Sequence, residues 1–113
     1  MTETAHAAIT LPEIKITAPG EAKAHLPKAG EAVLSALMIR AMRAHADSLG
    51  GEKTAKTVSI SVDVTGADFA GGEVALSSKV DRQTRTIIFM SGTLSADGTT
   101  LLKATSIFRL TDA

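Results

Sequence analysis

The pattern of apolar and polar positions is clearest in residues 30–49, GEAVLSALMIRAMRAHADSL, which contain no proline and no internal glycine. Arg40, Arg43 and Asp47 recur there at helical spacing on one narrow stripe, whereas apolar residues occupy most of the remaining circumference. About twenty helical residues extend about 30 Å, which is enough to cross a small domain. The pattern therefore predicts one long and largely buried helix.

Both ends of this helix carry residues that favour helix termini. Gly30 can occupy the N-cap position, and Glu31 places a negative charge in the first turn, where backbone N–H groups and the helix dipole favour it. Gly50 and Gly51 follow the last apolar residue and predict a left-handed C-cap. The helix is therefore expected to end at residue 49.

The chain after the helix alternates between apolar and polar residues with the period of two that is typical of strands. Residues 57–65 alternate strictly and predict a strand with one face in water. A second strand opens at residues 71–72 and ends in a turn at residues 81–84, and its apolar residues share one face with Ser78.

The last two predicted strands form a hairpin. Residues 86–96 offer apolar side chains on both faces, which is typical of a central strand or of one that packs against another subunit. Asp97 and Gly98 form the sequence of a tight two-residue hairpin turn. Residues 101–110 then return with their apolar side chains on one face.

The chain before the helix is less regular. Residues 9–16 alternate in two short phases around Pro12, which predicts one irregular edge strand. Residues 18–30 contain two prolines and two glycines and predict a loop that leads into the helix. Residues 1–8 contain little to bury and are expected to form a flexible end.

This order of elements predicts a single α+β domain over residues 1–113. The five predicted strands must bury an apolar face, and the helix is the one element long and apolar enough to cover it. We therefore expect a curved five-stranded antiparallel sheet wrapped around a long central helix. A cystatin-like roll has the same order of elements and stays open as an alternative, although the sequence lacks a Gln-x-Val-x-Gly inhibitory loop.

The amino-acid composition argues against several classes of partner and indicates a compartment for such a domain. The 12 basic and 12 acidic side chains cancel, and three Phe without Trp or Tyr leave few stacking platforms, so no nucleic acid partner is expected. The absence of cysteine excludes disulfides and thiolate zinc sites and suits a reducing cytoplasm. No secretory signal or membrane span is evident, so we expect a soluble cytoplasmic protein without a membrane partner.

The residues able to carry chemistry form no familiar motif. His6, His45 and Asp47 do not have a recognised metal-ligand spacing, so neither a metal site nor a cofactor is expected. The serines lack a neighbouring His–Asp arrangement and a Gly-x-Ser-x-Gly elbow. The sequence therefore does not indicate serine hydrolase chemistry.

Residues 30–110 resemble the hotdog-fold thioesterase superfamily, particularly the phenylacetate-type and 4-hydroxybenzoyl-CoA-type acyl-CoA thioesterases. Asp97–Gly98, Ala104–Thr105 and Phe108 match the typical ending of those proteins in order and spacing. The resemblance implies a hotdog fold, an acyl-CoA-like ligand bound at a subunit interface, and a homodimer joined edge to edge or a homotetramer built from such dimers.

The sequence departs from the family at the residues that carry its chemistry. Family members open the helix with His-Gly-Gly and place a carboxylate about two turns later, whereas Gly30, Glu31 and Ala32 stand at the first set of positions and Ile39 at the carboxylate position. The resemblance is therefore compatible with a thioesterase that uses helix N-terminal amides, and equally with a non-catalytic acyl- or CoA-binding or assembly module.

Several side chains are candidates for such a site. Glu31 is either a displaced general base or a simple complement to the helix dipole, and His25 is either an acid–base residue of a closing loop or an exposed loop histidine. Arg40 and Arg43 either hold a carboxylate or phosphate in a groove or form a solvated stripe in which Arg43 pairs with Asp47.

One further cluster of basic residues flanks a predicted turn. Lys79, Arg82 and Arg85 surround the hairpin connection that follows the second strand after the helix. A nucleotide phosphate of coenzyme A can dock there if the family analogy holds. Turns are commonly charged, however, so solvation alone also explains these residues.

Overall fold

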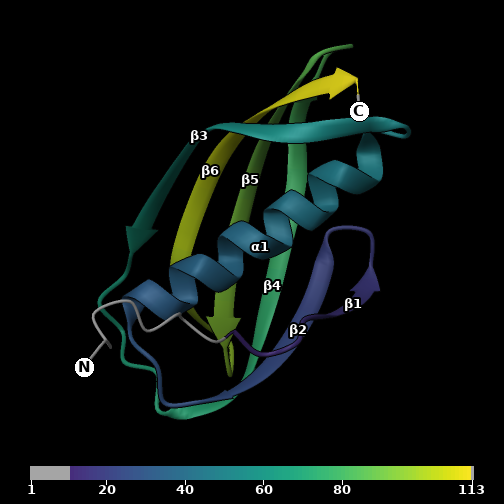
Figure 1. Ribbon diagram of the computed structural model, residues 1–113. Helices are drawn as coiled ribbons and strands as arrows, with labels where there is room; N and C mark the ends of the chain where they lie inside the picture. Colours follow the sequence, from purple (N-terminus) through teal and green to yellow (C-terminus); the bar gives the residue numbers. More distant parts are fainter. Residues whose placement is uncertain (1–10, 113) are drawn as a thin grey trace, which may run out of the picture.

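One long helix lies across the concave face of a curved antiparallel sheet in the computed structural model, which describes residues 11–112 (Figure 1). Predictions that concern residues 1–10, including the flexible end and His6, lie outside this range. The elements are β1 (Lys15–Ala18), β2 (Glu21–Pro27), α1 (Glu31–Leu49), β3 (Lys53–Val64), β4 (Gly71–Gln83), β5 (Ile87–Ala96) and β6 (Thr99–Asp112). The predicted wrapped-helix architecture is therefore confirmed.

The bounds of α1 agree with the prediction from its capping residues. Gly30 is the N-cap with an extended backbone, and Glu31 lies in the first turn. At the other end Gly50 keeps a right-handed conformation, and Gly51 supplies the left-handed residue with a φ of 63°. The helix is less deeply buried than predicted, because Ala44 is exposed beside the charged stripe.

The sheet contains six strands where five were expected, in the order β1-β2-β4-β5-β6-β3. The additional strand is β2, which occupies most of the predicted loop at residues 18–30. Its buried positions are Ala22, Ala24 and Leu26, and two small alanines give only a weak apolar alternation in the sequence. Pairing with β4 along its whole length stabilises it as a strand.

Two turns connect β4, β5 and β6. Asp97 and Gly98 have φ values of 50° and 77° and form the predicted tight hairpin turn between β5 and β6. The turn predicted at residues 81–84 is mostly strand, because β4 continues to Gln83 and the chain reverses only afterwards. There the Thr84 hydroxyl accepts a hydrogen bond from the N–H of Ile87 at 3.0 Å. The β4–β5 turn is thus stabilised by a side-chain hydrogen bond.

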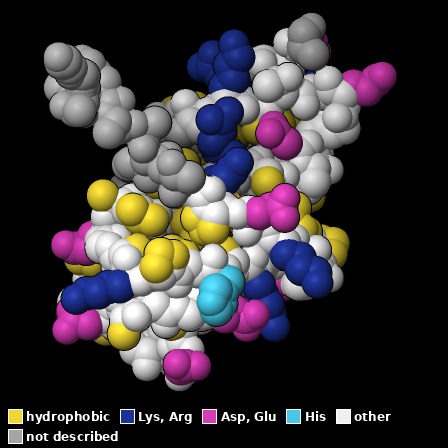
Figure 2. All heavy atoms as spheres, turned by 60° about the horizontal axis from the view of Figure 1, so that its bottom comes forward, with side chains coloured by type: hydrophobic (Ala, Val, Ile, Leu, Met, Phe, Trp, Pro, Cys, Tyr) yellow, Lys and Arg dark blue, Asp and Glu magenta, His cyan; other side chains and the backbone are white. Residues whose placement is uncertain are grey.

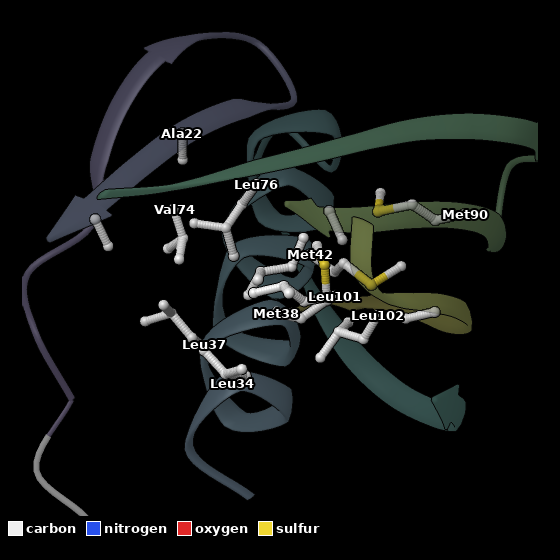
Figure 3. Packing of buried hydrophobic residues seen from close by; sticks show 14 of the residues in the cluster. Ala22, Leu34, Leu37, Met38, Met42, Val74, Leu76, Met90, Leu101 and Leu102 are labelled. Carbon is white, nitrogen blue, oxygen red and sulfur yellow. The ribbon is translucent and has the colours of Figure 1, made fainter. Parts of the chain in front are cut away.

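The core lies between α1 and the middle of the sheet. Leu37, Met38 and Met42 are fully buried on the inner face of the helix. Figure 3 shows these side chains meeting those that project from β4, β5 and β6. Gly92 of β5 permits this approach, since a Cβ there would lie 2.9 Å from Met38 Cε. β5 lies between β4 and β6, so its prediction as a central strand is confirmed.

The two edges of the sheet differ in length and regularity. β3 forms one edge with 12 residues, and among the strands of residues 11–112 it pairs only with β6. Val58 and Val64 on this strand are 57 % and 45 % exposed. β1 forms the other edge with four residues and an irregular register against β2. The described chain therefore presents one long edge that is open to a further strand.

Candidate functional site

The helix N-terminus predicted as the thioester site is open to solvent. Gly30, Glu31 and Ala32 are all exposed, and the Gly30 carbonyl accepts a hydrogen bond from the N–H of Leu34 at 3.2 Å. Ile39 is half-buried further along the helix. Glu31 is therefore the carboxylate that the first turn of α1 offers to a ligand at this end.

Two of the other predicted residues, Arg82 and Arg85, lie far from this end within one chain. His25 lies opposite Glu73 on the exposed face of β2. Arg82 and Arg85 lie at the far end of β4, since Pro27 pairs with Gly71 and β4 continues for 13 residues from there to Gln83. That separation is about 40 Å at the rise of a strand.

The two arginines of α1 have different surroundings. Both side chains are exposed, but Arg40 also lines a cavity, whereas Arg43 does not. The Asp47 carboxylate accepts a hydrogen bond from the N–H of Ala55 at 3.2 Å, so it holds β3 to the helix. Across residues 11–112, the one ion pair joins Lys23 to Glu73 and none joins Arg43 to Asp47.

A cavity lies between the second half of α1 and the β1–β2 hairpin. Its volume is about 550 Å³, within the range of small-molecule sites. Aliphatic side chains form much of its wall, and its polar and charged residues are Glu13, Thr17, Glu21, Arg40, His45, Ser48 and Ser78. Among the described residues of the chain, no group of three or more potential ligands is placed to hold a metal ion.

A hydrogen-bonded pair lies in the wall of this cavity. His45 Nδ1 and Ser78 Oγ are 2.8 Å apart, and Ser78 is buried on β4. Burial lowers the pKa of His45 below its ordinary value, and the nearby Glu21 carboxylate partly opposes that change. The imidazole is therefore predominantly neutral at neutral pH, and Ser78 can donate its hydroxyl proton to Nδ1.

Gly20 allows the hairpin to approach this pair closely. Its φ is 78°, and a Cβ at this position would lie 2.4 Å from the Ser78 carbonyl oxygen and 2.9 Å from His45 Cε1. The N–H of Ser78 donates to the Gly20 carbonyl at 2.7 Å. On the next residues, Ser77 donates its hydroxyl to Glu21 Oε2 at 2.6 Å. The hairpin is thus fixed to β4 beside the cavity.

The geometry suits ligand binding better than nucleophilic catalysis by serine. Ser78 is only 8 % exposed, and its own N–H is occupied by Gly20, so this amide is not available to stabilise an oxyanion. The sequence did not predict the pair, because His45 and Ser78 are 33 residues apart. The usable indication was a polar residue on the buried face of a predicted strand, which requires a partner.

The charge on the surface is mixed. Figure 2 shows apolar side chains gathered near the centre of one face, with basic and acidic side chains interspersed around them. This face carries no extended area of one sign, as expected from 12 basic and 12 acidic residues. No helix in residues 11–112 is long and apolar enough to cross a membrane.

Comparison with solved structures identifies the fold. The chain is similar to a phenylacetic acid degradation-related protein of Ralstonia eutropha, with 15 % identity over 87 % of this chain and 83 % of that one and a TM-score of 0.75. A Bacillus halodurans protein solved with CoA gives 16 % identity, 86 % and 70 % coverage and a TM-score of 0.75. A hypothetical thioesterase protein of Streptococcus pneumoniae solved with coenzyme A gives 19 % identity, 88 % coverage of both chains and a TM-score of 0.72.

Sequence comparison adds no closer relative. No protein-family model matches the chain, and no curated protein matches it either. The resemblance to hotdog-fold thioesterases is therefore confirmed at the level of the fold, and the cystatin-like alternative is set aside. At identities of 15–19 %, the residues of the site must be argued from this chain itself.

Proposed function

We propose, from the premise that the chain has the hotdog fold of thioesterase-type proteins, that it binds an acyl-CoA-type thioester at a subunit interface. Two of the similar structures were solved with CoA. The observation that carries the proposal is the exposed N-terminus of α1 at Gly30, Glu31 and Ala32, whose backbone donors can meet a thioester carbonyl.

The free edge of β3 supports the interface. Joining two copies through this edge about a two-fold axis places the Val64 end of one strand beside the Lys53 end of its partner. In each chain the N-terminus of α1 lies toward the Val64 end, and the β4–β5 turn toward the Lys53 end (Figure 1). Pairing therefore brings the partner's β4–β5 turn, which contains an arginine, to the end of the sheet that holds Glu31.

In this arrangement, predicted site residues that are far apart within one chain can contact the same ligand. The turn contains Arg85 and follows Arg82, and both are exposed. Guanidinium groups there suit the phosphates of a CoA-type carrier, while the helix N-terminus receives the thioester. A homodimer, or a tetramer of two such dimers, is thus the proposed assembly. We also propose a cytoplasmic location, because a chain without cysteine suits a reducing compartment.

Hydrolysis is the second candidate function, and Glu31 favours it. This carboxylate lies in the first turn, beside the donors that would polarise the thioester carbonyl. Binding is preferred because Ile39 replaces the family carboxylate, and because Glu31 would repel a developing oxyanion at the same end.

Thiol release and direct binding distinguish the two candidates. Short-chain, long-chain and aryl acyl-CoAs are supplied to the purified protein, and free thiol and bound ligand are both measured. Saturable binding without thiol release is the expected result. Turnover that Glu31→Ala abolishes would overturn the binding role in favour of hydrolysis. A strict monomer in sedimentation at all concentrations would contradict the shared site.

A further inference from the structure

We propose that the cavity between the second half of α1 and the β1–β2 hairpin is a second ligand site, which takes an aliphatic monocarboxylate. This site is separate from the interface site proposed above and does not depend on it. The cavity lies along the C-terminal half of the helix, near Arg40 and His45, whereas the thioester site is at Glu31. Nine residues separate Glu31 from Arg40, which is about 13 Å along the helix axis.

The walls fit an alkyl chain. They consist mainly of small or branched aliphatic side chains, and the imidazole of His45 is their one aromatic ring. The aliphatic residues include Ile14, Ile16, Ala22, Ala41, Ala44 and Leu76. Ile16 is 63 % exposed, the highest value among the large apolar side chains of the described residues. An alkyl chain that lies in the cavity removes apolar surface of this kind from water, which is the main driving force for binding.

Three polar atoms of the inner wall, His45 Nδ1, Ser78 Oγ and the Ser78 backbone nitrogen, already have hydrogen-bond partners. His45 and Ser78 satisfy each other at 2.8 Å. The N–H of Ser78 is already bonded to the Gly20 carbonyl at 2.7 Å. A chain laid against them therefore incurs little desolvation cost from these groups.

Arg40 provides the recognition of the head group. It is the one lysine or arginine in the cavity wall, and it forms no ion pair with any residue between 11 and 112. Its planar fork suits a carboxylate. Glu21 also lines the cavity, and one oxygen of its carboxylate accepts the Ser77 hydroxyl, a neutral donor that does not cancel the charge. Glu13 is an acidic residue of the same wall, so a cationic analogue is the decisive comparison.

The length of the cavity sets the length of the chain. The lining residues of the helix run from Arg40 to Ser48. Eight residues of helix span about 12 Å, which is the length of an extended chain of about eight to ten carbons with bonds of about 1.5 Å. Decanoate is therefore the probe that matches both the walls and the head group.

Isothermal titration with decanoate, decan-1-ol and decylamine tests the site on the full chain. We expect one saturable site per chain and binding of decanoate about tenfold tighter than that of decan-1-ol. Absence of saturable decanoate binding would overturn the proposal. Equal or tighter binding of decylamine would overturn the role of Arg40 and assign the cavity to Glu13, Glu21 and cations.

Matched variants locate the binding. Arg40→Gln should weaken decanoate binding about tenfold and leave decan-1-ol unaffected, whereas Arg43→Gln, outside the cavity wall, should change neither. Ala44→Trp should block the cavity from an exposed helix position that needs no core rearrangement, which an unchanged melting temperature checks. Ala44→Trp should leave binding of free CoA intact. Decanoate therefore tests the cavity and CoA tests the interface site, so one proposal can fail without the other. Decanoate binding that survives Ala44→Trp would place it elsewhere.

Discussion

Replacement of Gly20 by alanine is the sharpest test of how the hairpin is attached to the rest of the molecule. Gly20 lies in the turn between β1 and β2, with a φ of 78°. An added methyl group there would approach the Ser78 carbonyl oxygen to 2.4 Å and His45 Cε1 to 2.9 Å. The first contact is with backbone, so the hairpin must move away from β4 to accept the methyl group.

The size of the effect follows from three contributions. A left-handed backbone costs an L-residue other than glycine about 1–2 kcal/mol. Steric overlap in a packed region typically adds about 1–3 kcal/mol, and loss of the Ser78–Gly20 backbone hydrogen bond adds about 1 kcal/mol. Gly20→Ala should therefore lower the free energy of unfolding by about 3–6 kcal/mol.

Gly98→Ala is the matched control. Gly98 has a φ of 77°, nearly the same as Gly20, but a Cβ there meets nothing within 4 Å. Only the backbone cost applies, so this variant should lose about 1–2 kcal/mol. Urea unfolding followed by circular dichroism measures both values. Equal losses in the two variants would refute the close approach of the hairpin to Ser78 and His45.

Three further outcomes follow from the fold. Because burial lowers the pKa of His45, the unfolded chain binds more protons there, so stability should fall as the pH drops below about 6.5; His45→Gln should flatten this part of the urea-midpoint profile, and an unchanged profile would contradict the burial. Met42→Ala removes a fully buried side chain and should cost about 2–5 kcal/mol in chemical unfolding, whereas a loss near zero would contradict the packing of α1 on the sheet. Val58→Lys puts a charge near the middle of the free β3 edge and should shift the sedimentation mass toward the monomer, and an unaltered mass would exclude joining through this edge.

The parts of the fold that can be predicted are those specified by residues close together in the sequence. Helix α1 combines a continuous apolar pattern with glycines at both ends, and the Asp97–Gly98 turn needs only two residues. β2 was missed because its buried residues include Ala22 and Ala24, which alternate too weakly to stand out from a segment rich in proline and glycine. Its strand conformation depends on β4, which lies beyond the helix in the sequence.

The cavity was missed for a related reason. His45 and Ser78 belong to a helix and a strand that local patterns identify correctly, but their contact arises from the register of β4 and the rotation of α1. Neither quantity is encoded in a short window of sequence. The position of Arg40 beside a cavity, and of Arg43 outside it, likewise depends on how the hairpin folds over the helix.

The unequal edges of the sheet limit how far assembly can proceed. A strand partner can extend along the 12 residues of β3, but β1 offers only four residues, an irregular register and a neighbouring Pro19. Pairing of β3 with a second β3 uses the same surface on both molecules and leaves only short, irregular edges outside. In the proposed dimer, growth of the sheet would therefore stop at two copies, and the open β3 strand would not start a fibre.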